Sequence, residues 1–105
     1  MNGFLDERAT FYSGRLRERL GANLKKVILF GSRARGDFNE GSDYDFAVIL
    51  GRRDKQVRDI ITEVEVEFLN KYDKLSASLV YDETEWFKRQ RLPIGINIER
   101  EGINL

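Results

Sequence analysis

The segment SDYDFAVIL, residues 42–50, places two aspartates one residue apart at the start of an apolar run. Alternation along a strand would put Asp43 and Asp45 on the same face, roughly 7 Å apart. Asp43 alone could be a turn residue, but Asp45 borders an apolar run, where an unpaired carboxylate is costly to bury. Neighbouring carboxylates raise each other's pKa unless a cation neutralises them. Because Mg²⁺ typically binds one or two protein carboxylates plus substrate phosphate, the pair predicts a magnesium site.

The dipeptide Gly31-Ser32 ends the preceding apolar run, residues 27–30, and could bind phosphate. Glycine lets a phosphate approach the backbone, and Ser32 offers a hydroxyl and an N–H at the start of a helical turn. Arg33 and Arg35 add guanidinium donors, and we expect at least one of them to contact nucleotide. Either arginine could instead be a solvated residue or a salt-bridge partner. Phosphate donors followed by cation ligands are typical of phosphoryl or nucleotidyl transfer.

Two better-known phosphate and cation motifs do not match this stretch. Gly31 and Gly36 have the spacing of a P-loop, but Asp37-Phe38 follows where a P-loop has Lys-Ser or Lys-Thr. An EF-hand loop that began at Asp37 would need glycine at its sixth position and glutamate at its twelfth, and neither is present.

The composition narrows the chemistry further. The chain of 105 residues suits one domain, residues 1–105, and has no cysteine and no histidine, which excludes disulfides, thiolate or imidazole metal ligands and Ser-His triads. Any bound metal is therefore a hard cation held by oxygen. Basic and acidic residues balance at 18 each, so direct nucleic-acid binding is not expected. Without an 18-residue apolar run or a signal peptide, we expect a cytoplasmic protein that does not enter a membrane.

The elements that must position these residues follow from apolar spacing. Apolar residues at helical spacing from Leu5 to Leu20 predict a first helix that ends at Gly21. We expect buried strands over 27–30 and 45–50, and a loop with a short helical turn between them. The pattern then predicts the following: Asp54 as the N-cap of a helix that ends near Lys71, a third strand over 75–81, an Asp82/Glu85 capping box before Trp86 and Phe87, and a last segment from Pro93 to Gly102. Together these elements indicate an α/β (α+β) fold with a small mixed sheet flanked by helices.

The pattern Gly31-Ser32, ten residues, Asp43-Tyr44-Asp45 resembles the signature of the DNA polymerase beta-like nucleotidyltransferase superfamily. The fuller stretch GSRARGDFNEGSDYDFAVIL is similar to the minimal nucleotidyltransferase (MNT) family, the small partners of HEPN proteins in prokaryotic toxin–antitoxin pairs. The C-terminal NIEREGINL is similar to the end of many such proteins, so the resemblance covers nearly the whole chain.

The resemblance implies a polymerase beta-like nucleotidyltransferase fold and a role for each matched residue. Gly31 and Ser32 would hold the β- and γ-phosphates of ATP, and Asp43 and Asp45 would be the catalytic aspartates that bind Mg²⁺. The chain would transfer AMP to a hydroxyl of a HEPN ribonuclease, a tyrosine in related MNT proteins, and so neutralise it. The partners implied are the HEPN toxin and a nucleoside triphosphate.

One part of the family pattern is missing. The superfamily usually has a third carboxylate on the next strand, near Ser78 by the family's spacing, and we expect Ser78 to face the two aspartates. Asp73 and Asp82 lie at the two ends of that strand, and either could replace the missing acid. Without it, transfer would be slow, and the alternative function is a catalytically silent, nucleotide-binding antitoxin that occludes its partner. A template-directed polymerase fragment is a weaker third alternative, because 105 residues leave no room for a DNA-binding surface.

Overall fold

The computed structural model describes residues 6–105, which form four strands and five α-helices. The sheet consists of β1 (Leu24–Phe30), β2 (Tyr44–Leu50), β3 (Ser76–Asp82) and the short β4 (Ile103–Asn104). The helices are α1 (Glu7–Leu20), α2 (Ser32–Arg35), α3 (Lys55–Tyr72), α4 (Glu83–Arg89) and α5 (Pro93–Glu101), with a 3₁₀ turn, η1, over Gly21–Asn23. The expected α/β class is confirmed, and within the described residues no helix is long and apolar enough to span a membrane.

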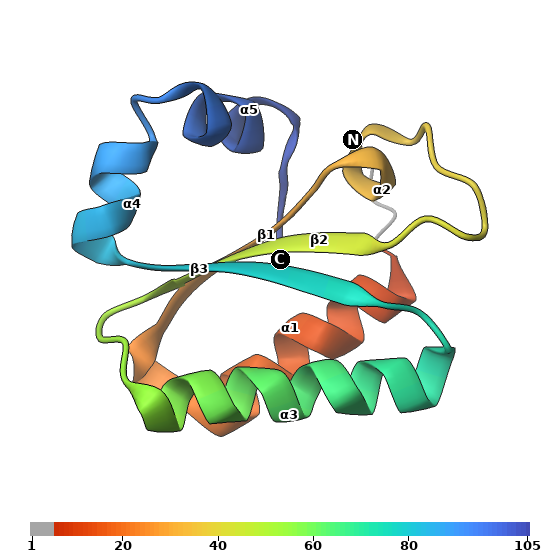
Figure 1. Cartoon of the computed structure of the whole chain (residues 1–105), viewed down its shortest axis with the longest axis horizontal. Helices are drawn as coiled ribbons and strands as arrows, with labels where there is room; N and C mark the ends of the chain where they lie inside the picture. Colours follow the sequence, from red (N-terminus) through yellow and green to blue (C-terminus); the bar gives the residue numbers. More distant parts are fainter. Residues whose placement is uncertain (1–5) are drawn as a thin grey trace.

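The strands are ordered β3-β2-β1-β4, so β3 lies at one edge of the sheet. Strand β1 is antiparallel to both β2 and β4, whereas β2 and β3 are parallel. Helices α1 and α3 lie on one side of the sheet, and α2, α4 and α5 lie on the other (Figure 1). The molecule therefore has three layers, with the sheet in the middle, and each side of the sheet has its own apolar cluster.

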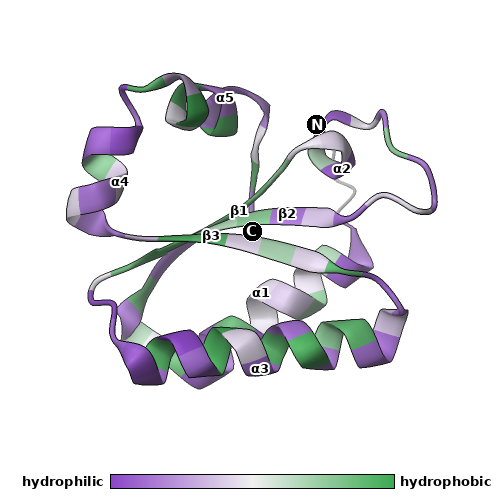
Figure 2. Cartoon of the chain, in the orientation of Figure 1, coloured by the Kyte–Doolittle hydropathy of each residue, from purple (hydrophilic) through white to green (hydrophobic). Residues whose placement is uncertain are grey.

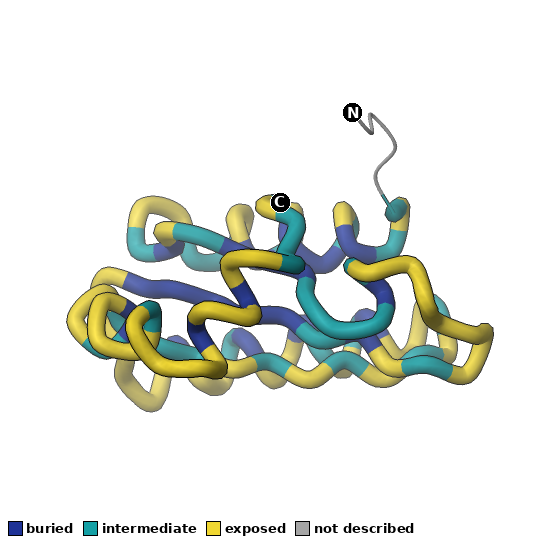
Figure 3. The backbone as a smooth tube through the Cα atoms, turned by 90° about the horizontal axis from the view of Figure 1, so that it is seen from above, coloured by how far each residue is buried: buried dark blue, intermediate teal, exposed yellow. Residues whose placement is uncertain are grey.

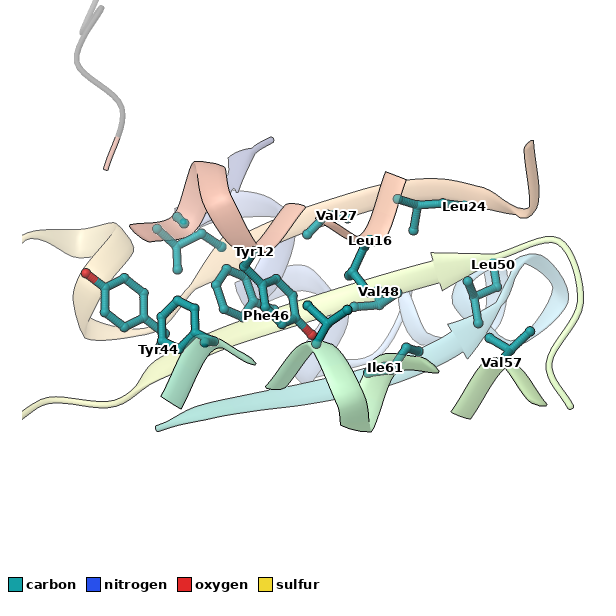
Figure 4. Packing of buried hydrophobic residues seen from close by; sticks show 14 residues of the cluster. Tyr12, Leu16, Leu24, Val27, Tyr44, Phe46, Val48, Leu50, Val57 and Ile61 are labelled. Atoms are coloured by element: carbon teal, nitrogen blue, oxygen red, sulfur yellow. The ribbon is translucent and has the colours of Figure 1, made fainter. Parts of the chain in front are cut away.

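The larger cluster fills the space between the sheet and the α1/α3 layer. Tyr12 and Leu16 of α1 meet Phe46 and Val48 of β2, and the Tyr12 and Phe46 rings stack at 3.9 Å (Figure 4). The green apolar positions of α3 in Figure 2 recur at helical spacing, and four of them are buried: Val57, Ile61, Val64 and Phe68. This periodic apolar face explains why α3 packs against the sheet rather than standing in solvent.

The smaller cluster packs α4 and α5 onto the opposite face of the sheet. Trp86 and Ile98 cover Ile28, Ala47 and Ile49, so both faces of the central strands are buried along most of their length. The tube in Figure 3 shows the central strands in dark blue and the connecting loops mostly in yellow. The part of this face nearest α2 is left to polar residues, and it contains the predicted site.

Most expected boundaries agree with the structure, because local capping signals set them. Asp54 accepts a hydrogen bond from Val57 N at 2.9 Å as the N-cap of α3, and Asp82 and Glu85 form the expected capping box. Strand β1 begins at Leu24, three residues before the predicted start, and β4 was not predicted. Leu5, which the apolar spacing assigned to the first helix, lies outside the described residues.

Candidate nucleotide and metal site

The site is built where β1 turns into α2 beside the start of β2. Phe30, the last residue of β1, pairs with Asp45 in the antiparallel register, so the next residue, Gly31, lies against the Asp45 side chain. Gly31 has a φ of 77°, and a Cβ at this position would collide with the Asp45 carboxylate. Glycine is therefore required both by the backbone conformation and by the close approach of the carboxylate.

Gly31 also starts the single turn of α2 that carries Ser32. The Gly31 carbonyl accepts hydrogen bonds from Ala34 N and Arg35 N, both at 3.0 Å, and Gly36 N donates to the Ser32 carbonyl at 2.9 Å. Gly36 has a φ of 92°, which ends the turn in the left-handed conformation. Ser32 thus has a fixed, half-buried position next to the residue that touches Asp45.

Asp45 lies on β2 and Asp43 immediately precedes the strand, on either side of Tyr44, which is fully buried in the α1/α3 layer. The pKa of Asp45 is raised above its ordinary value, first because the carboxylate is partly buried and then because of repulsion by Asp43. The Arg35 guanidinium opposes this shift. The donor set is two carboxylates with no nitrogen or sulfur ligand, which fits a hard cation such as Mg²⁺. No cluster of three or more acidic residues that could hold a metal occurs within residues 6–105.

Arg35 is held beside the site by two carboxylates. Its Nε donates to Asp37 at 3.2 Å, and its Nη1 donates to Glu101 at 3.0 Å. Glu101 is the last residue of α5, and Gly102, which follows it, packs closely against Ile28 before β4 pairs with β1. The C-terminal segment therefore anchors Glu101, which in turn holds Arg35. The spacing of residues gave no signal for this contact, because the two residues are 66 positions apart.

Arg33 is placed differently from the expectation of a free phosphate ligand. It is 6% exposed, and its guanidinium lies over the rings of Phe38 and Tyr44 at 4.3 and 4.6 Å. Its Nη2 donates to the Ser42 carbonyl at 3.0 Å, which fixes the loop that leads into β2. This geometry favours a structural role for Arg33 and leaves Arg35 as the better nucleotide ligand of the two.

The prediction that Ser78 faces the aspartates is wrong. In the parallel register Ser78 pairs with Phe46, and both side chains point toward the α1/α3 layer. The Ser78 hydroxyl donates to Glu65 Oε2 at 2.7 Å, and because its single hydrogen is used there, it accepts from the Tyr12 hydroxyl. Burial raises the pKa of Glu65 and of Tyr12, while the Ser78 hydrogen bond opposes both shifts. Ser78 thus joins a polar network beneath the sheet.

The residue of β3 that pairs with Asp45 is Ala77, and it is exposed. Asp73 ends α3 in the left-handed conformation, and Asp82 caps α4 at the far end of β3, where it pairs with Leu50. Both aspartates therefore have capping roles, and neither is in register with Asp45. Sequence reasoning missed Ala77 because the register of a strand pair decides which residue faces the site, and a shift of one residue reverses the face.

Comparisons with known proteins show the family of the chain. The family model of the nucleotidyltransferase domain matches residues 12–102. The chain is 33% identical over 87 residues to MJ0604 of Methanocaldococcus jannaschii, which is named as a protein adenylyltransferase, and the match covers 83% of each chain.

Similar solved structures share the fold. A toxin–antitoxin complex with AMP-PNP matches with a TM-score of 0.61 at 19% identity, covering 94% of this chain and 72% of that one. A complex of tri-AMPylated HEPN toxin with MNT antitoxin from Shewanella oneidensis matches with a TM-score of 0.52 at 17% identity, covering 92% and 70%.

Proposed function

Because this chain belongs to the nucleotidyltransferase domain family, we propose that it is an MNT-type antitoxin that transfers AMP from ATP to a HEPN partner protein. The observation that carries the proposal is the contact between Gly31 and Asp45. It joins the expected phosphate-binding turn directly to the expected metal-binding carboxylate. The name of MJ0604 and the AMPylated toxin in the similar complex support protein as the acceptor.

Different residues of this chain would bind the metal ion and the phosphates of the substrate. Asp43 and Asp45 would hold Mg²⁺, which when bound neutralises phosphate charge and lowers the barrier to displacement at phosphorus. Gly31 and Ser32 would bind the β- and γ-phosphates through the backbone and the hydroxyl, and Arg35 would add a cation beside them. In Figure 1 the short α2 stands above the start of β2, the arrangement that this assignment requires.

The transfer itself is a displacement at the α-phosphorus. The acceptor oxygen, which we expect to belong to a tyrosine, forms a bond to that phosphorus while the bond to the β-phosphate oxygen breaks and pyrophosphate leaves. The proton of the hydroxyl passes to water, because the strand position beside Asp45 is Ala77 rather than an acid. A missing proton acceptor typically costs about 10²–10⁴-fold in rate, so we expect slow transfer.

The presence of Ala77 rather than an acid beside Asp45 also favours a second function, a catalytically silent antitoxin that binds nucleotide and occludes its partner. An incubation of the chain with the HEPN-domain protein of its own genome and radiolabelled ATP separates the two. Label on the HEPN protein that requires Mg²⁺ and Asp45 establishes transfer. A stable complex without label, in which the ribonuclease is nevertheless inactive, establishes occlusion and contradicts the transfer proposal.

A further inference from the structure

Strand β3 leaves one side of its backbone unpaired at the edge of the sheet. Tyr44 N donates to the Leu75 carbonyl at 3.0 Å, and the parallel register follows from there. In a parallel pair, alternate residues bond to the neighbouring strand. The N–H and C=O groups of Ser76, Ser78 and Val80 therefore point away from β2. Strand β3 forms the rim nearest the viewer in Figure 1, and no strand formed by residues 6–105 lies beyond it.

Among the described residues, side chains cap only the far end of this edge. Arg53 Nη1 donates to the Val80 carbonyl at 2.6 Å, and Glu85 accepts from Asp82 N at 2.9 Å. Within residues 6–105 no comparable contact covers the outward backbone of Ser76 or Ser78. Proteins commonly protect exposed strand edges, so an edge that is protected at one end and open at the other indicates a place for a partner.

The open end of the edge is the end beside the candidate site. Ala77, between the two open serines, pairs with Asp45 and points to the same side of the sheet. The opposite flank of Asp45 is taken by Gly31, where the nucleotide would bind. One approach to Asp45 crosses β3, where Leu79 is 38% exposed and Leu75, immediately before the strand, is 57% exposed. An incoming chain would therefore find open backbone groups and apolar side chains together.

We propose that the acceptor is an extended peptide segment that adds to the open edge of β3 as a further strand and presents a tyrosine across Ala77. The inference rests on the proposed function for its chemistry, which is the displacement at the α-phosphorus described above. The backbone groups of Ser76 and Ser78 supply the pairing, and Leu75 and Leu79 supply apolar contact.

The geometry of a sheet selects the acceptor side chain. Neighbouring strands are about 4.8 Å apart, so an added strand would lie about 10 Å from β2 and the Asp45 carboxylate that it carries. A serine or threonine hydroxyl lies close to its own backbone and cannot span two strand spacings. A tyrosine side chain is long enough to lean across β3 at Ala77, the residue that pairs with Asp45.

The first test measures binding without nucleotide, so that it does not depend on catalysis. The probe is a peptide of alternating threonine and valine with a central tyrosine and a lysine at each end. It is titrated into the isotope-labelled chain while amide hydrogen exchange is followed. We expect the amides of Ser76 and Ser78 to exchange at least tenfold more slowly with peptide. Unchanged exchange at millimolar peptide would overturn the proposal. Protection that appears without peptide and grows with protein concentration would also overturn it, because the edge would then pair with a second copy.

The second test uses a variant that alters only the outward side of the strand. Ser76→Pro removes an N–H that points away from β2, a replacement that edge strands tolerate. Ser76→Ala is the matched control, because the buried Ser76 hydroxyl has no hydrogen-bond partner in the described chain. With labelled ATP, we expect Ser76→Pro to lower labelling of the tyrosine peptide at least tenfold with ATP affinity unchanged, and Ser76→Ala to stay within twofold of wild type. Equal labelling by both variants would contradict strand addition. If the wild-type chain does not bind ATP, the proposed function is wrong, whatever the peptide result.

Discussion

On the face of β2 and β3 that contacts α1 and α3, Phe46 is fully buried and Ser78 is partly buried, and the serine is hydrogen-bonded to Tyr12 and Glu65. On the opposite face, the residues immediately before them, Asp45 and Ala77, border solvent. The two pairs are one position apart in the same strands, yet one pair belongs to a packed interior and the other to the candidate site. Because side chains alternate between the two faces of a strand, adjacent residues can serve packing on one face and the candidate site on the other.

The difference also shows where a carboxylate can be added. A new acid at Ser78 would lie beside the partly buried Glu65 carboxylate, which now accepts the Ser78 hydrogen bond. A new acid at Ala77 would stand in solvent beside the two aspartates, where a bound cation could neutralise it. The same substitution at adjacent residues should thus have opposite consequences.

The largest expected effect comes from testing this contrast directly. Ser78→Asp should destabilise the fold by about 1–2 kcal/mol, because it replaces the hydroxyl that donates to Glu65 with a second, partly buried carboxylate. Ala77→Asp should leave the midpoint of unfolding nearly unchanged and raise the AMP transfer rate at least tenfold, since it supplies a proton acceptor beside the acceptor hydroxyl. Urea unfolding and the labelled-ATP assay measure the two effects. A stable Ser78→Asp variant with faster transfer would show that the assignment of the two faces is reversed.

A second prediction separates the phosphate-binding turn from the rest of the site. Ser32→Ala should weaken ATP binding about tenfold, the value of one hydrogen bond to a charged group, and should change AMP binding less than twofold. The reason is that the hydroxyl would contact the β/γ end of the triphosphate. Calorimetric titrations with both nucleotides provide the comparison, with Ser13→Ala on α1 as control. Equal losses for ATP and AMP would mean that Ser32 only shapes the turn.

A smaller effect is expected where the C-terminal segment meets the site. Glu101→Gln keeps a hydrogen-bond acceptor for Arg35 but removes a negative charge that offsets the guanidinium. We expect ATP affinity to rise about two- to threefold, since exposed ion pairs have weak effects. Glu99→Gln on the same helix, whose partner is Lys26 at 3.7 Å, should leave ATP affinity unchanged. If both variants bind ATP equally, Arg35 does not contribute to the nucleotide site.

The smallest effect concerns the stability of the chain without metal. Burial and Asp43 raise the pKa of Asp45, so this residue favours the folded state only while it is protonated, and that contribution is lost as the pH rises. Asp45→Asn should therefore raise the free energy of unfolding at pH 7, by at most about 1 kcal/mol because solvent screens a half-buried carboxylate. The gain should vanish near pH 3. Thermal unfolding of both proteins at pH 7 and pH 3, with EDTA present, measures the difference. An Asp45→Asn variant that is less stable than wild type at pH 7 would contradict the prediction.

Local signals were enough to predict much of this fold. Caps such as Asp54 and the Asp82/Glu85 box define helix starts within a few residues of sequence, and apolar periodicity identified α3 and the buried strands. The Gly31-Ser32 turn and the Asp43/Asp45 pair could be placed together because they stand at the two ends of one connection, residues 31–43, between consecutive strands.

The remaining features depend on contacts between distant segments. The register of β3 against β2 is set by packing of the α1/α3 layer, so the sequence of β3 alone could not show that Ala77, not Ser78, lies beside Asp45. The two residues of β4 are too few for a periodic pattern. The burial of Arg33 depends on the rings of Phe38 and Tyr44, which the loop brings around it.

Calorimetric titration of ATP into the wild-type chain and into Asp45→Asn, each with and without Mg²⁺, tests the central claim most directly. We expect binding to the wild-type chain that strengthens at least tenfold with Mg²⁺, because the cation would join the triphosphate to Asp43 and Asp45. The variant should lose the Mg²⁺-dependent part of the affinity and retain its fold. Equal, Mg²⁺-independent ATP affinity in both proteins would contradict a nucleotide and metal site at the junction of β1, α2 and β2.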